Sequence, residues 1–217
     1  MRNKFEQELE LLNSDLIEMG NLVESSIEAA VTALIDQNVE LAKRVVEGDR
    51  EVNNKEKDIE SRCLKLLLQQ QPVAKDLRLI SSALKMVTDM ERIGDQASDI
   101  SDITIRLANE KYIKELVHIP QMAQETIKMV RESINAFVHR DLDLVMEVIL
   151  YDDKVDNLFS IIKDELVEQI RSNLEHSEQS IDLLMIAKYF ERIGDHSQNI
   201  AEWVYFAITG EHYTGAK

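Results

Sequence analysis

Apolar residues recur every three or four positions over long stretches of this chain, with few residues that would end a helix. One such stripe runs from Phe5 to Leu34 without a break, and comparable stripes run from Ile127 to Phe137 and from Leu158 to Ile170. The 217 residues include only six Gly and two Pro, whereas ordinary proteins contain about 7% and 5% of these two residues. A 3–4 residue apolar period with few breakers is typical of long amphipathic helices. The sequence therefore predicts an all-α protein.

Short polar interruptions divide the pattern into six helices joined by short loops. The interruptions follow Asp36, Gln69, His139 and Asn173, and one more lies just before Pro120. The predicted helices span residues 3–36, 39–70, 73–110, 119–139, 141–173 and 178–209. Short loops between long helices place sequential helices side by side and antiparallel. We therefore expect helical bundles.

The chain contains an internal repeat. The pentapeptide Glu91–Asp95 recurs as Glu191–Asp195, and a weaker match upstream relates the Asp49 region to the Asp152 region at a separation of 103 residues. The two pentapeptides are 100 residues apart, whereas the upstream matches are 103 residues apart. The three-residue difference arises near Pro72, inside a predicted loop, where a duplicated chain tolerates insertions. We predict two tandem, pseudo-symmetric three-helix bundles, with the first repeat covering residues 1–112 and the second covering 113–217.

The formal net charge of −16 limits the classes of partner. Carboxylates repel a phosphate backbone and anionic lipid headgroups, so we expect neither nucleic-acid binding nor docking to a membrane through a basic patch. No apolar run is long enough for insertion into a membrane, and the N-terminus has no apolar segment typical of a signal peptide. With Cys63 as the single cysteine, no internal disulfide can form. A cytoplasmic location is expected.

Acidic residues spaced by four positions form two repeated stripes beside the apolar ones. On the third helix of each repeat the residues are Glu91, Asp95 and Asp99, then Glu191, Asp195 and Asn199, and on the second helix they are Asp49 and Asn53, then Asp152 and Asp156. Facing pairs of this kind would form an oxygen-rich cage, which suits divalent or trivalent metal ions. The alternative is a solvated acidic face, partly neutralised by neighbours such as Arg92 and Lys188. Because Gly94 and Gly194 lie inside the same predicted helices at a cost of about 1 kcal/mol each, and because the pattern occurs twice, we favour metal sites.

Several of these motifs together resemble the PhoU family of phosphate-signalling regulators. The resemblance rests on residues 71–78 (QPVAKDLR), on both ERIGD segments, on Val46–Asp49 and on Asn199–Glu202, and it covers nearly the whole chain. It implies a metal-binding cytoplasmic homodimer that links the ATPase subunit of the Pst phosphate transporter to a PhoR-type sensor histidine kinase. Such a protein would act as a negative regulator when phosphate is plentiful. The metal implied is iron or zinc, with manganese, magnesium or calcium as alternatives.

Two other interpretations remain open at this point. One is a carboxylate-bridged metalloenzyme, either a hydrolase or an oxidase, which would need an open coordination position and a general base. The other is an acidic structural or chaperone-like bundle that binds no metal. The chain has no Ser-His-Asp pattern and no glycine-rich nucleotide-binding loop. We therefore expect no catalytic residues and no organic cofactor, and we predict that the protein is not an enzyme.

Overall fold

The computed structural model describes residues 2–69 and 73–215, and over these residues the chain is almost entirely helical. The helices are α1 (Arg2–Asp36), α2 (Val39–Gln69), α3 (Ala74–Leu107), α4 (His118–His139), α5 (Leu142–Ser172) and α6 (Ser177–Thr209), with a short 3₁₀ helix η1 (Leu174–His176) before α6. The predicted all-α class is confirmed, and most helix ends lie within two residues of the predicted ones. The predicted end of the second helix, at residue 70, lies outside the described residues. The third helix ends three residues earlier than expected, and η1 was not predicted. No helix in the described part is both long enough and apolar enough to cross a membrane.

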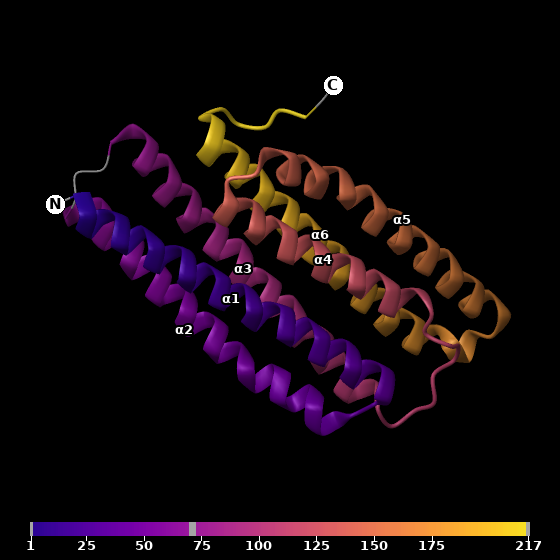
Figure 1. The fold of residues 1–217 in the computed structure, drawn as a ribbon. Coiled ribbons are helices and arrows are strands. Elements are labelled where there is room, and N and C mark those ends of the chain that lie inside the picture. The colour runs from indigo at the N-terminus through magenta and orange to yellow at the C-terminus, as the bar shows by residue number, and fades with distance from the viewer. Residues whose placement is uncertain (1, 70–72, 216–217) are drawn as a thin grey trace.

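Two antiparallel three-helix bundles lie side by side (Figure 1), as predicted. Helices α1–α3 form one bundle and α4–α6 form the other. The two bundles meet along α3 and α6, with a further contact between α1 and α4, while α2 and α5 lie on the outside. This arrangement leaves one face of each outer helix available to solvent or to partners.

Both bundles are built on the predicted apolar stripes. In α1, Leu12, Leu16 and Met19 are completely buried. Cys63 is also buried, and burial raises the pKa of its thiol to about 12. A thiol held in its neutral form in an apolar core is chemically inert, so Cys63 serves packing.

The turns between the first two helices of each bundle repeat in detail. Gln37 and Arg140 both have left-handed backbone conformations, with φ values of 50° and 54°. The next residues, Asn38 and Asp141, cap the following helices, because their side-chain oxygens accept from backbone N–H groups at 3.0–3.1 Å. Side-chain caps of this kind stabilise a helix start by about 1 kcal/mol. The local chemistry therefore reproduces the 103-residue repeat.

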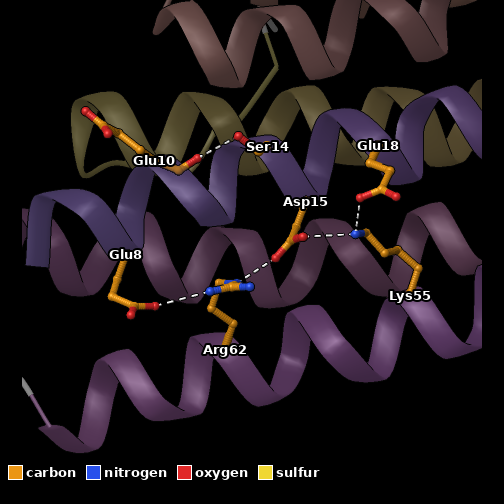
Figure 2. Close-up of polar contacts among 7 residues, drawn as sticks. All are labelled: Glu8, Glu10, Ser14, Asp15, Glu18, Lys55 and Arg62. Atoms are coloured by element: carbon orange, nitrogen blue, oxygen red, sulfur yellow. Dashed lines mark hydrogen bonds and ion pairs between the residues drawn. The ribbon is translucent and has the colours of Figure 1, made fainter.

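Ion pairs join α1 to α2 (Figure 2). Lys55 Nζ lies 2.9 Å from Asp15 Oδ1 and also contacts Glu18, while Arg62 Nε lies 2.6 Å from Asp15 Oδ2 and its Nη1 is 3.2 Å from Glu8. These two cations hold the pKa of Asp15 below its usual range, against the opposing effect of burial. The network fixes α1 against α2 on the side away from α3.

A related polar contact joins the first two helices of the second bundle. His118 stands where the first repeat has Asp15, and its Nδ1 lies 2.7 Å from Oε1 of Glu165, which stands where the first repeat has Arg62. The position therefore keeps a polar contact between the first two helices of each bundle, with a carboxylate on α5 in place of the guanidinium on α2.

The segment 108–117 connects the bundles, and polar contacts hold its first half. Gln37 Nε2 donates to the carbonyls of Leu107 and Glu110, at 3.1 and 2.6 Å. Tyr112 donates its hydroxyl to the Leu34 carbonyl, and Gln179 bonds to the backbone of residues 111 and 113. The predicted boundary between residues 112 and 113 falls in this segment and stays a prediction.

Candidate metal centres

The first carboxylate cluster lies where α2 packs against α3. Asn53 Nδ2 donates to Asp49 Oδ2 at 2.8 Å. Gly94 allows the close approach, because a Cβ atom there would lie 3.0 Å from Val52 Cγ1 and 3.5 Å from Asp49 Oδ1. That second oxygen, Asp49 Oδ1, is buried and has no hydrogen-bond partner among the described residues. A buried polar atom without a partner costs free energy, so this oxygen has an acceptor capacity that a cation would satisfy.

The second cluster repeats this geometry between α5 and α6. Asp152 Oδ1 is buried and has no hydrogen-bond partner within the described chain. A Cβ atom on Gly194 would lie 3.0 Å from this oxygen and 3.3 Å from Val155 Cγ1. Each glycine is therefore explained by the close approach of a carboxylate-bearing helix. The duplication extends to the aspartate oxygen that lacks a partner, and in the first cluster Asn53 Oδ1 is also buried without one among the described residues.

Burial and mutual repulsion raise the pKa of several carboxyl groups in both clusters. The pKa of Asp152 rises to about 7, first because of burial and then because of Asp156 and Asp195. Raised pKa values, with burial first among the causes and nearby carboxylates adding to it, are also found at Asp49, Glu91, Asp99, Asp156 and Asp195. A bound cation would reverse this repulsion, because it favours the ionised form of every carboxylate beside it.

Basic side chains accompany each cluster, as the solvated-face alternative expects. Arg92 Nη1 lies 2.9 Å from Asp95 Oδ2, and its Nε is 3.5 Å from Glu91 Oε2. Lys188 forms an ion pair with Glu191. In each of these ion pairs a single basic side chain faces a cluster with more than one carboxylate, so the pairs neutralise the clusters only in part.

Two of the predicted ligands lie at the seam between the bundles. Asp99 accepts a hydrogen bond from Tyr189 of α6. Asn199 Nδ2 lies 3.3 Å from Asp89 Oδ1 of α3, and the same oxygen is 2.8 Å from His196 Nδ1. Residues four apart on a helix drift by about 40° per step, which turns the last position of each stripe toward the neighbouring bundle. His196 of α6 also contacts this seam.

Glu56 belongs to the first cluster but was not among the predicted ligands. It follows Asp49 by seven positions on α2, and its pKa is raised by burial and then by Glu91 and Glu60. Asn53 follows Asp49 by four positions and Glu56 follows Asn53 by three, so the three residues share one face of α2. This spacing could have identified Glu56 from the sequence. In the described part of the chain, no three His, Cys, Asp or Glu side chains are already arranged to hold a metal ion.

Comparison with known proteins identifies relatives of the whole chain. The family model described as "PhoU domain" matches the chain twice, at residues 16–104 and 119–204. The chain is 37% identical over 97% of its length, and over 96% of the relative, to a "Phosphate-specific transport system accessory protein PhoU homolog" of Clostridium acetobutylicum. It is 32% identical to the PhoU accessory protein of Escherichia coli, with 97% of this chain and 87% of that protein covered.

A solved structure agrees with the sequence comparison. The crystal structure of PhoU from Pseudomonas aeruginosa superposes with a TM-score of 0.91 at 38% identity, and the match covers 95% of this chain and all of that one. The similarity therefore includes the complete arrangement of both bundles.

Proposed function

The chain belongs to the PhoU family, and on that premise we propose that it is a metal-binding cytoplasmic regulator of phosphate uptake and phosphate-starvation signalling. The protein is an accessory regulator of phosphate transport, and it is not an enzyme: its relatives are named as accessory proteins. In the proposed role it links the ATPase subunit of the Pst transporter to a PhoR-type sensor histidine kinase and represses the starvation response when phosphate is plentiful.

The metal part of the proposal is supported by the two equivalent buried oxygens, Asp49 Oδ1 and Asp152 Oδ1, that lack partners. In the first site Asp49 would bind together with Glu91 and Asp95, supported by Asn53, Glu56 and Asp99. In the second, Asp152 would bind with Glu191 and Asp195, supported by Asp156 and Asn199. A cation bound there supplies positive charge that joins the second and third helices of each bundle. Iron or zinc is proposed first, with manganese, magnesium or calcium as alternatives.

The adaptor role is supported by apolar side chains exposed on the outer helices. Leu150 and Ile161 on α5 are 66% and 44% exposed, and Leu68 near the end of α2 is 82% exposed. Apolar surface of this kind is suited to protein contacts, including a homodimer. Two rigid bundles that dock on a transporter or kinase would act by favouring one state of that partner.

Elemental analysis tests metal binding. We expect stoichiometric metal in gently purified protein, and loss of it in the double variant Asp49→Asn/Asp152→Asn, with Asp58→Asn as an exposed control on α2. Absence of metal from the unaltered protein would leave the metal-free acidic bundle as the better interpretation.

A phosphate-starvation reporter tests regulation separately. In a strain that lacks the gene, we expect the reporter to be active in high phosphate, to be repressed again by the unaltered gene and to remain active with the double variant. A reporter that stays low in the deletion strain would refute the regulatory role whatever the metal content.

A further inference from the structure

An open groove of about 290 Å³ runs between α1 and α2 on the outside of the first bundle. Its walls are mostly small or apolar: Leu22, Ser26 and Ala29 from α1, and Val45, Gly48 and Val52 from α2. Gly48 lies inside α2, where glycine costs about 1 kcal/mol relative to alanine. Unlike Gly94 and Gly194, it has no atom within 4 Å of where a Cβ would be. No packing within the described chain therefore requires a glycine at this position.

The second bundle contains the equivalent groove in a filled form. The groove between α4 and α5 measures about 30 Å³ and is lined by Tyr151, which stands 103 positions after Gly48. The Tyr151 hydroxyl donates to Glu125, and Lys128 Nζ lies 4.2 Å from the centre of the ring. The position equivalent to Lys128 in the first bundle is Ser25. The second repeat thus shows that an aromatic ring fits the equivalent groove of its own bundle.

Two charged residues of α2 lie on either side of Gly48 in the open groove and indicate which charges an occupant would carry. Arg44 precedes Gly48 by four positions and Glu51 follows it by three, so all three share one face of α2. Both charged residues line the groove and are exposed, and neither forms an ion pair with a described residue. An occupant with complementary charges would carry an aromatic ring between an acidic group, which faces Arg44, and a basic group, which faces Glu51.

We propose that the α1/α2 groove docks a helix of a partner protein, which inserts one aromatic side chain over Gly48 and places an acidic residue against Arg44 and a basic residue against Glu51. The ring takes the place that Tyr151 occupies in the second bundle. Because α2 and α5 are the outer helices, such a helix reaches the groove without separating the bundles. The proposal identifies a surface and does not depend on metal binding or on the regulatory role.

A stapled helical peptide of about 15 residues, long enough to hold several turns, provides the probe. It carries a central tyrosine, with glutamate one turn to one side and lysine one turn to the other, and a second peptide has the two charges in reverse order. We expect one order to bind with a Kd of about 1 mM or tighter and to shift the amide NMR signals of Ser25, Gly48 and Glu51. Replacing the peptide tyrosine by alanine should abolish binding.

Variants of the protein test whether the peptide binds in the groove. Gly48→Tyr fills the groove as in the second bundle, so it should weaken binding at least tenfold while the thermal midpoint stays equal or rises. Ser160→Tyr, which adds the same ring on an exposed face of α5, should leave binding unchanged. Should Gly48→Tyr fail to fold, Ser25→Lys tests the same wall of the groove. Glu51→Lys should weaken binding, and exchanging the peptide lysine for glutamate should restore it.

Three outcomes would overturn the proposal. The first is that neither peptide binds. The second is that Gly48→Tyr, folded, binds as tightly as the unaltered protein. The third is that the signals of the groove shift on dilution without peptide, which would show that a second copy of this chain occupies the groove.

Discussion

Replacing Asp152 by asparagine should stabilise the metal-free protein at neutral and alkaline pH. Asparagine keeps the shape of the side chain and removes its charge. Burial, followed by the charges of Asp156 and Asp195, raises the pKa of Asp152 to about 7. Ionising this carboxyl group in the folded protein therefore costs more than ionising it in the unfolded chain, and the variant avoids that cost.

The size of the effect follows from the linkage between protonation and folding. A rise from 3.8 to about 7 sets an upper limit of about 4 kcal/mol, at 1.36 kcal/mol for each pKa unit. Asp152 is partly exposed, so screening by water reduces this limit to about 1–2 kcal/mol. Because the folded pKa is the higher one, the stabilising contribution is complete below about pH 4 and is lost as the pH rises through about 7.

Urea unfolding of metal-free protein at pH 4 and pH 8 measures this difference. Asp152→Asn should match the unaltered protein at pH 4 and exceed it by about 1–2 kcal/mol at pH 8, which corresponds to about 2–4 °C in thermal midpoint for each kcal/mol. Asp164→Asn, an exposed substitution on the same helix, should change neither value. Added metal should raise the midpoint of the unaltered protein more than that of the variant, because a ligand that binds only the folded state stabilises it.

The opposite sign at pH 8 would refute the reasoning. If metal-free Asp152→Asn is less stable than the unaltered protein at pH 8, then the ionised carboxylate makes a favourable contact in the folded state, and its Oδ1 atom is not without a partner.

Three further substitutions test other contacts. Asp15→Asn should cost about 1–2 kcal/mol at pH 7, because Asp15 is held between two cations of α2; since its folded pKa is lowered, the cost should shrink as the pH falls below about 4, and a pH-independent cost in urea unfolding would contradict this. Gly194→Ala should destabilise by about 1 kcal/mol despite its better helix propensity, because its Cβ would lie 3.0 Å from Asp152 Oδ1; a more stable variant in the same assay would show that this space is not needed. Tyr112→Phe should cost about 1 kcal/mol in thermal unfolding through loss of the hydrogen bond to Leu34, and an unchanged midpoint would show that the bond contributes nothing.

The end of a helix was predictable where neighbouring residues in the sequence determine it. It was less predictable where contacts with residues far away in the sequence determine it. The α4–α5 turn lies at His139–Asp141 as expected, because a capping aspartate and the end of an apolar stripe are adjacent in sequence. The third helix ends at Leu107, earlier than predicted. There the side chain of Gln37, seventy positions away, bonds to the carbonyls of Leu107 and Glu110. No local pattern in residues 108–110 carries that information.

The candidate metal sites were also predictable only in part from the sequence. Spacing by four residues placed Glu91 and Asp95 on one face of one helix, and the repeat transferred the pattern to the second copy, because both depend only on the helical period. The periodicity did not show that the stripe rotates Asp99 away toward Tyr189 at the seam. That depends on where α6 crosses α3.

The sequence by itself determined the helices, the duplication and the helix faces that carry carboxylates. The tertiary structure decided which atoms on those faces are paired: it left Asp49 Oδ1 and Asp152 Oδ1 buried without partners, and it left the groove beside Gly48 open while Tyr151 lines its equivalent. The reason is physical. A helical period fixes the direction of a side chain from its own axis, whereas burial and pairing depend on the distance and angle to a second helix, which only the packed bundle defines.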